Sequence, residues 1–470
     1  MTSEVFTPNK APTFTSVTRS ELWDEVEALS EQGGAFISVM GTTKLGKSTL
    51  VKSVMKKAAF YVYIPGQNLS SGAGALWTRL ASELGIPAST TSGKVVGDKS
   101  KWSFMARFGI SVPGFNSSAG AGVEGEHHVD QSSGSTYEMD TPSAVAEAMA
   151  MLAADARTKG GFPPIIVIDD FHFVIDVEKR RELILALRPL AESDVTVILA
   201  TLPGREADPG FDDTNVGGRH YPVSVPIWSD DELREIATTG FKTLNVAAAP
   251  DVVTTLIEQS YGSPQIMQQL CLNLCRSVNK VKDDNSGVGM LDAPTEWAGF
   301  FRLVKDPQSS KWLKTLGLGL TARNPRKVKG ELPDGRLFDG YQLILWALHQ
   351  MGAPTEVSFV DLRAKINELP TVASIGVGRF ALEQKAKNMN SLASREMTGA
   401  LSRHAEAVEL DEDENSLDAS LFSEEELRLA AQIPQPVFEV SGEKAANMKL
   451  TILDPLLAYT LSWHPEAFDR

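Results

Sequence analysis

The sequence predicts an α/β protein in which a three-layer parallel sheet carries a phosphate loop and is followed by a helical lid and a winged-helix-like α+β domain. Three observations support this prediction. Residues 41–48, GTTKLGKS, form a complete phosphate-binding motif. Apolar strand patterns alternate with helical patterns between residues 35 and 203, as in parallel sheets. A further apolar run at 163–168 is closed by the carboxylates Asp169 and Asp170.

The phosphate loop lies between a strand pattern at 35–40 and a helical pattern at 49–57. In that setting the backbone N–H groups of the loop and of the helix N-terminus converge on phosphates, and the two glycines permit close approach. Lys47 would reach the β- and γ-phosphates, and the Ser48 hydroxyl would ligate Mg²⁺. We therefore expect ATP and Mg²⁺ to bind at Gly41, Thr42, Thr43, Lys44, Leu45, Gly46, Lys47, Ser48 and Thr49.

The acidic pair supplies the remaining chemistry of such a site. Asp169, at the end of a buried strand, would hold Mg²⁺ opposite Ser48, and Asp170 would polarise the attacking water. Thr201 ends the strand pattern at 195–203, where its hydroxyl would hold that water or sense the γ-phosphate. A threonine at a strand end is also common without any such role.

Two arginines are candidates for an arginine finger, which supplies positive charge to the transferring phosphoryl group. These are Arg188, within a helical pattern, and Arg205, just after a strand. Most arginines in such positions are surface charges, so both interpretations stay open.

The composition excludes several other classes of protein. At 470 residues the chain should form two or three domains. A formal net charge of -15 argues against broad, non-specific nucleic-acid binding. Cys271 and Cys275 lie four residues apart on one helical face, where buried thiols are expected rather than a metal site or disulfide. No signal peptide or membrane-spanning run is visible, which predicts a cytoplasmic protein without membrane partners.

Composition and periodicity also predict the domain organisation. A Gly- and Ser-rich stretch at 89–140 interrupts the alternation and is interpreted as an insertion. A basic connector follows the lid, and acidic runs lie within the last domain. The expected domains are a phosphate-loop core at 1–227, a helical lid at 228–285, a linker at 286–340 and a winged-helix-like domain at 341–470.

Together, residues 12–282 resemble the AAA+ and STAND branches of P-loop ATPases, especially the clade related to origin-recognition ATPases. The resemblance implies that the loop and Asp169-Asp170 are Walker A and B, that Thr201 is sensor 1, and that Pro264 of the lid lies against the nucleotide base. Hydrolytic AAA+ motors carry Asp-Glu at the Walker B end. The shorter Asp-Asp pair here favours slow hydrolysis and a switch-like role.

Two functions are therefore expected. The first is a nucleotide-dependent switch in a protein assembly or self-assembly, of the STAND signalling or defence kind. The alternative is a DNA-binding AAA+ ATPase of replication, partition or transposition type, which uses the winged helix. Acidity and the Asp-Asp pair favour the first, whereas the winged-helix pattern and the basic connector favour the second.

Overall fold

The computed structural model describes the chain in several segments. They form two compact units, each described by itself: Ser20–Met40 with Lys47–Ser224, and Met1–Arg19 with Gly41–Gly46 and Val225–Arg470. No helix within the described segments has the length and apolarity to cross a membrane. The described residues are 2–10, 12–86, 141–203, 210–211, 216, 218–282, 289–319, 330–370, 372, 382–392, 437–442 and 447–468.

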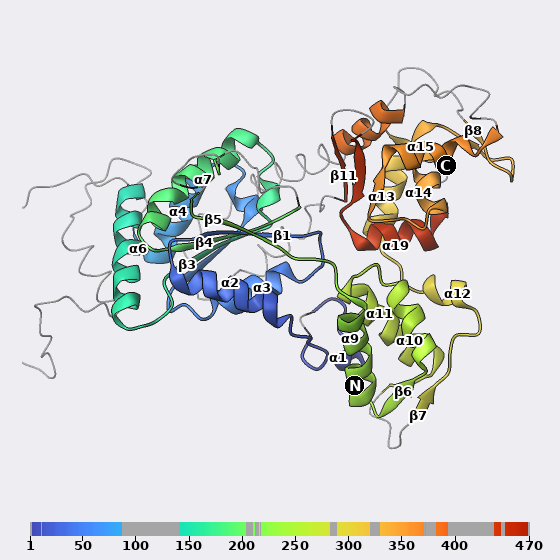
Figure 1. Cartoon of the computed structure of the whole chain (residues 1–470), viewed down its shortest axis with the longest axis horizontal. Coiled ribbons are helices and arrows are strands. Elements are labelled where there is room, and N and C mark those ends of the chain that lie inside the picture. Colours follow the sequence, from blue (N-terminus) through green and yellow to red (C-terminus); the bar gives the residue numbers. More distant parts are fainter. Residues whose placement is uncertain are drawn as a thin grey trace, which may run out of the picture. The chain divides into compact units, whose positions relative to one another are not determined.

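The first unit is built on a five-stranded parallel sheet with the strand order β2-β3-β4-β1-β5 (Figure 1). This confirms the expected α/β class. Every residue of the three central strands is buried, because helices cover both faces of the sheet. The strands are β1 (Phe36–Met40), β2 (Tyr61–Pro65), β3 (Ile165–Asp169), β4 (Thr196–Thr201) and β5 (His220–Ser224).

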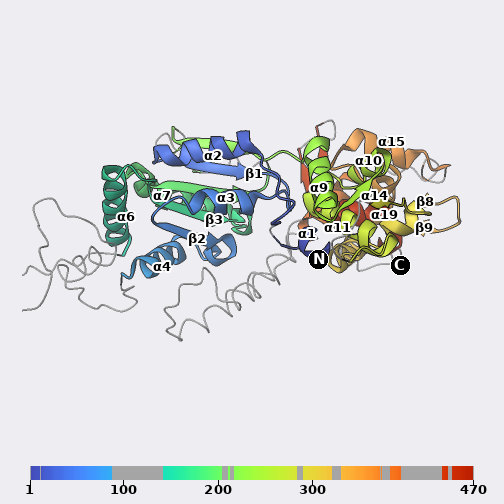
Figure 2. The ribbon, with the colours of Figure 1, turned by 90° about the horizontal axis from the view of Figure 1, so that it is seen from below.

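Helices form the two outer layers of this unit. α2 and α3 cover one face of the sheet, and α4, α6 and α7 cover the other (Figures 1 and 2). The core on the second side joins alternate strand residues, such as Ile166 and Leu199, to leucines of these helices. The helices are α2 (Ser20–Gln32), α3 (Lys47–Met55), η1 (Gly66–Leu69), α4 (Ala73–Leu84), α6 (Thr141–Thr158), η2 (Phe171–Phe173) and α7 (Val177–Glu192).

The second unit begins with a helical bundle, here named the lid. The amino-terminal arm contributes to its core, because Phe6 packs edge-on against Phe241 at 5.5 Å between ring centroids and closely approaches Gly240, where a Cβ would clash. The elements are α1 (Thr2–Val5), α9 (Asp230–Thr243), β6 (Val246–Ala248), α10 (Pro250–Glu258), α11 (Pro264–Asn273), η3 (Leu274–Val278), β7 (Gly289–Leu291) and α12 (Trp297–Phe301).

The remainder of this unit has its own core, formed by helices around the antiparallel sheet β10-β12-β11. In this sheet β12 pairs with β11 on one side and with β10 on the other. The elements are α13 (Pro307–Leu318), β8 (Gly330–Glu331), β9 (Leu337–Phe338), α14 (Gly340–Gln350), β10 (Glu356–Ser358), α15 (Phe359–Asn367), β11 (Phe438–Ser441), β12 (Lys449–Ile452), α19 (Pro455–Trp463) and η4 (Pro465–Phe468).

Residues 286–340, expected as a linker, are packed in large part. β7 pairs with β6 of the lid, and Phe300 and Phe301 join the lid core. α13 contributes Trp312 and Leu313 to the C-terminal core. The basic composition of this region concealed the apolar helix faces. The insertion at 89–140 lies outside the described residues.

The two cysteines are fully buried in the lid core, as expected. Burial raises the pKa of the Cys275 thiol to about 12 and that of Cys271 well above its usual value. Because the thiolate is the reactive form, both thiols should resist a disulfide reagent at pH 8 in the folded protein and react on unfolding. A stopped-flow thiol titration with and without denaturant measures this. Rapid reaction of the folded protein would contradict the packing of α11.

Candidate nucleotide site

The carboxyl end of β3 presents the two acidic residues expected there. Asp169 is the last residue of the strand and is 4 % exposed. One of its carboxylate oxygens, Oδ1, accepts the N–H of Asp170 at 3.1 Å. Asp170 adopts the left-handed conformation, with φ 54° and ψ 42°. That conformation costs a non-glycine residue energy and turns the chain sharply out of the sheet, so it places two adjacent carboxylates at one edge.

Lys47, the first residue of α3, is the cation of this edge. It is only 6 % exposed. Burial lowers the pKa of its ammonium, while the negative charges of Asp170 and Asp169 act in the opposite direction. A buried ammonium is costly unless opposite charges compensate it, so the two carboxylates and Lys47 form one electrostatic unit. The sequence predicted these three residues, and the structure brings them together.

Tyr63, on the neighbouring strand β2, contacts the carboxylate of Asp169. Its phenol O–H donates to Oδ2 of Asp169. The register Pro65↔Asp169 brings the carboxyl ends of β2 and β3 together. The Lys52 ammonium lies 4.7 Å from the centroid of the Tyr63 ring. Burial and the Asp169 charge raise the pKa of the phenol, so it stays a hydrogen-bond donor at every physiological pH.

Tyr63→Phe should lower the free energy of unfolding by about 1–3 kcal/mol, because it leaves a buried carboxylate oxygen without its donor. The measurement is urea unfolding followed by tryptophan fluorescence. Tyr61→Phe, on the same strand and less buried, is the matched control and should have little effect. Equal losses in both variants would show that the phenol of Tyr63 does not hold Asp169.

The phosphate loop has the backbone conformation its motif requires. Gly46 has φ +93°, a backbone angle that residues with a side chain rarely adopt. A Cβ placed on it would meet no atom of the described residues within 4 Å. The loop is therefore open above Gly46, as a phosphate cradle must be. Lys44 also has a positive φ, 63°, in a position where a non-glycine residue costs about 1–3 kcal/mol. Ser48 and Thr49 follow Lys47 in the first turn of α3.

One contact to the loop was not foreseen from the sequence. The indole N–H of Trp228 donates to the carbonyl of Leu45 at 3.1 Å, and the backbone N–H of Trp228 donates to Gly262 O at 3.2 Å. Trp228 thus bridges the loop to the segment before Pro264, which is the first residue of α11. The role of Pro264 against a base stays a prediction.

Two buried polar residues near the carboxyl ends of the strands each have a side-chain oxygen without a hydrogen-bond partner among the described residues. Thr201 is 2 % exposed, and its Oγ1 has no hydrogen-bond partner there. The registers Met40↔Thr201 and Ile168↔Leu199 place it between the ends of β1 and β3. Gln67, in η1 after β2, is buried with an unpartnered Oε1. Such orphaned polar atoms need a ligand or water, which fits a site for a hydrated nucleotide and metal.

Of the two arginine candidates, only Arg188 lies among the described residues. Arg188 lies on α7 and pairs with Glu192 at 2.8 Å, one turn along the same helix. Arg205 lies outside the described residues. A finger role for either residue stays a prediction.

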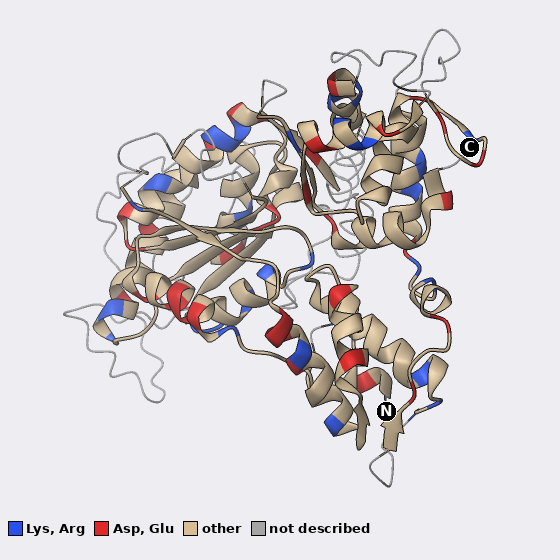
Figure 3. Ribbon diagram, turned by 45° about the vertical axis from the view of Figure 1, so that its right-hand side comes forward, with Lys and Arg blue, Asp and Glu red and all other residues tan. Residues whose placement is uncertain are grey.

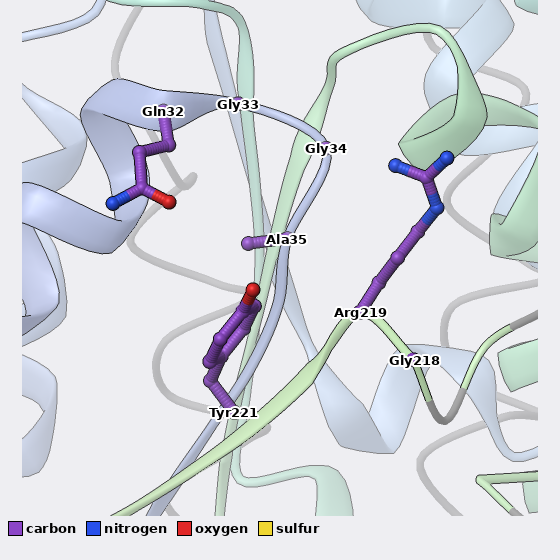
Figure 4. Close-up of a pocket in the computed structure, with 7 residues that line it drawn as sticks. All are labelled: Gln32, Gly33, Gly34, Ala35, Gly218, Arg219 and Tyr221. Atoms are coloured by element: carbon purple, nitrogen blue, oxygen red, sulfur yellow. The ribbon is translucent and has the colours of Figure 1, made fainter.

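A shallow hollow of about 410 Å³ lies in the same unit but belongs to the opposite edge of the sheet (Figure 4). Gln32, Gly34 and Ala35 precede β1 there, and Arg219 and Tyr221 come from the start of β5. In a parallel sheet the amino ends of the strands lie opposite the carboxyl ends, where Asp169 and Thr201 are. The hollow is therefore separate from the nucleotide site.

The geometry defines an α/β protein with a phosphate loop and an acidic strand end. Comparison with family models finds no match, and a search of curated proteins also finds none. Solved structures that match include the ADP form of the Aeropyrum pernix ORC2 protein, with 10 % identity over 100 % of this chain and 99 % of that one, and a TM-score of 0.43. A Walker-type ATPase of Pyrococcus abyssi has 13 % identity over 94 % and 95 % of the two chains, and a TM-score of 0.42.

The Aeropyrum pernix ORC1 protein, solved in complex with DNA, matches with 11 % identity over 99 % of this chain and 96 % of that one, and a TM-score of 0.40. The structures similar to this chain thus include ORC and Cdc6 proteins. At these identities the likenesses are distant ones of fold. The function proposed below rests on the residues of this chain.

Proposed function

We propose that this chain binds ATP with Mg²⁺, hydrolyses it slowly and acts as a nucleotide-dependent switch in a protein assembly. The observation that supports this most strongly is the buried Lys47 ammonium, which follows the phosphate loop directly and interacts with the paired carboxylates Asp169 and Asp170. A buried cation that directly follows a phosphate-loop motif suits a polyphosphate better than any neutral ligand.

Each residue of the edge then has a role. Lys47 holds the β- and γ-phosphates, and the loop N–H groups hold their oxygens. Ser48 and Asp169 would hold Mg²⁺, which when bound supplies positive charge to the phosphate oxygens. Asp170 accepts a proton from the attacking water, and the Thr201 hydroxyl orients that water. Tyr63 positions Asp169 through its hydrogen bond.

Slow turnover follows from the length of the Asp170 side chain. An aspartate is one methylene shorter than the glutamate of hydrolytic AAA+ motors, so its carboxylate reaches less far toward the water. Proton transfer in the transition state depends on hydrogen-bond distance, and a longer gap lowers the rate. A long-lived ATP state is what a switch needs.

The charges of the C-terminal part favour a protein partner over a phosphate backbone. Basic and acidic residues are interspersed along the ribbon there (Figure 3). Arg363 pairs with Glu383 at 3.2 Å, Lys365 with Glu368 at 2.7 Å and Lys449 with Glu356 at 2.7 Å. Cations already paired with carboxylates release few counterions from DNA, so they contribute little to its binding.

Equilibrium binding of a fluorescent ATP analogue, with and without Mg²⁺, tests the proposed site. We expect saturable binding that Mg²⁺ strengthens, and we expect Ser48→Ala to lose the Mg²⁺ dependence. Ser53→Ala is the matched control, because Ser53 lies on the same helix and its hydroxyl bonds Leu50 O at 2.7 Å. Absent binding, or an unchanged Mg²⁺ dependence in Ser48→Ala, would overturn the assignment.

Light scattering of the same samples with ATP, with ADP and without nucleotide tests the switch. A mass that rises with ATP supports self-assembly. An identical mass in all three states, together with no nucleotide-dependent capture of another protein, would contradict it.

DNA binding is the second candidate, and one observation favours it. Lys311 and Lys314 lie on the exposed face of α13, three residues apart and without a described ion pair. If they contact phosphates, duplex binding should weaken steeply with salt, and the double change to glutamine should reduce the slope by about two ions. Binding that is absent at low salt would exclude this candidate.

A further inference from the structure

The tip of the phosphate loop is in contact with the turn between β12 and α19, 410 positions further along the chain. The backbone N–H of Thr43 donates to the carbonyl of Leu453 at 3.1 Å, and the Thr43 hydroxyl donates to the same oxygen at 3.0 Å. The Lys44 ammonium contacts both carboxylate oxygens of Asp454, at 2.7 and 2.9 Å. Loop and turn belong to the same compact unit.

The donors that the loop uses in this contact, a backbone N–H and an ammonium group, are of the kind that bind the phosphates of a nucleotide. A phosphate loop binds its ligand through backbone N–H groups and ammonium groups, which meet phosphate oxygens. Here a carbonyl oxygen meets the N–H of Thr43 and a carboxylate meets the ammonium of Lys44. The carbonyl oxygen carries a partial negative charge and the carboxylate a full one, so both use loop donors that phosphate oxygens could also use.

The ion pair between Lys44 and Asp454 is largely shielded from solvent, so its electrostatic attraction is only weakly screened. The Asp454 side chain is 6 % exposed and that of Lys44 is 25 % exposed. Water and salt screen such a pair much less than an exposed one. Lys44 is also a long, flexible cation at a loop position with positive φ, so its ammonium can be redirected without moving the backbone.

Asp454 connects this contact to the lid. Its Oδ1 also caps α19 by accepting the N–H of Leu456 at 2.9 Å. On α19, Tyr459 lies in the lid core, and its O–H donates to Phe301 O at 2.8 Å. Tyr261 of the lid donates to the Ser462 hydroxyl at 2.6 Å. A change at Asp454 thus acts on a helix that packs against the lid.

We propose that Lys44 and Asp454 form an exchangeable ion pair, by which the C-terminal part of the chain occupies the phosphate loop until a nucleoside triphosphate displaces it. On binding, the Lys44 ammonium and the Thr43 N–H turn to phosphate oxygens, and the Leu453–Asp454 turn is released. The two interactions are thermodynamically linked. The factor by which the docked turn lowers the affinity for nucleotide equals the factor by which bound nucleotide lowers the affinity of the turn for the loop. The inference rests on the proposed ATP site and names its regulation.

Asp454→Asn tests the pair on the full chain. The asparagine keeps an oxygen that caps α19 but removes the charge that holds Lys44. We expect ATP affinity to rise about fivefold or more, the lower range of typical coupling between sites. We also expect faster hydrogen exchange of the α19 amides without nucleotide, whereas the wild-type protein reaches that rate only when ATP is added.

Asp339→Asn is the matched control. Asp339 is likewise a buried aspartate that caps a helix of this unit, α14, through the N–H groups of Tyr341 and Gln342. It should leave both ATP affinity and α19 exchange unchanged. Lys44→Met is the second variant, on the more exposed partner, and should also speed α19 exchange without nucleotide.

The outcomes separate this inference from the proposed site. If Asp454→Asn and Lys44→Met match Asp339→Asn in α19 exchange, the ion pair does not hold the turn and the inference is overturned, whatever the ATP affinity. If both variants speed exchange but ATP neither binds the wild-type protein nor changes its exchange, the proposed nucleotide site is the part that fails. Faster exchange together with tighter ATP binding supports both.

Discussion

Lys47→Met should remove measurable ATP binding. The substitution keeps the length of the side chain but deletes the buried ammonium, on which the negative charges of Asp170 and Asp169 act. Truncating one partner of a buried, hydrogen-bonded charge pair costs about 2–5 kcal/mol, or roughly 30- to several thousand-fold in affinity. Without the ammonium, the negative charges of Asp169 and Asp170 would also repel the phosphates. We therefore expect a loss of affinity in the upper part of this range. Isothermal titration with ATP and Mg²⁺ measures it.

Lys56→Met is the control for this change, because Lys56 follows the same helix α3 and is exposed. It should bind ATP as the wild-type protein does. Thermal unfolding of both variants distinguishes lost binding from lost folding. An ATP affinity of folded Lys47→Met within a few-fold of the wild-type value would mean that the phosphates lie elsewhere.

Asp170→Asn should abolish turnover while leaving nucleotide bound. General base catalysis contributes about 10²- to 10⁴-fold in rate, and an amide cannot accept the proton from water. Asparagine adopts the left-handed conformation of Asp170 as readily as aspartate, so the backbone at the end of β3 should persist. We expect single-turnover hydrolysis to fall by at least about 100-fold, with ATP affinity changed only a few-fold.

Asp194→Asn serves as the control, because Asp194 also has a positive φ, 64°, in the same unit and pairs with Arg157 on the surface. It removes a carboxylate from a left-handed turn away from the strand end. Its hydrolysis rate should equal that of the wild-type protein. Retained hydrolysis in Asp170→Asn would transfer the role of base to another residue of the edge, for which Asp169 is the nearest carboxylate.

Much of the sheet could be predicted from local sequence. β1, β3 and β4 are continuous apolar runs because helices bury both faces, and the motif fixed the loop that follows β1. β5, His220–Ser224, was not foreseen, because Pro222 and exposed side chains conceal it. Proline is tolerated there because β5 is an edge strand, paired on one side only with β1.

The site was predictable only where a residue type has a fixed chemical task. Lys47, Asp169 and Asp170 follow from the motif and the acidic strand end. Tyr63 could not be foreseen, because its contact with Asp169 depends on the pairing of β2 with β3. The contacts of Trp228 with Leu45 and of Asp454 with Lys44 join segments far apart in sequence, and no local periodicity encodes them.

The discontinuity of the second unit has a consequence for synthesis on the ribosome. The sheet unit is complete once Ser224 has emerged, so it can fold while the rest of the chain is still being made. Phe6 emerges before Phe241 and cannot be buried against it until that residue has been made. The loop residue Lys44 waits longer still, for Asp454. During that interval the nascent chain carries an open phosphate loop, so a cellular nucleotide can reach it before the C-terminal turn does.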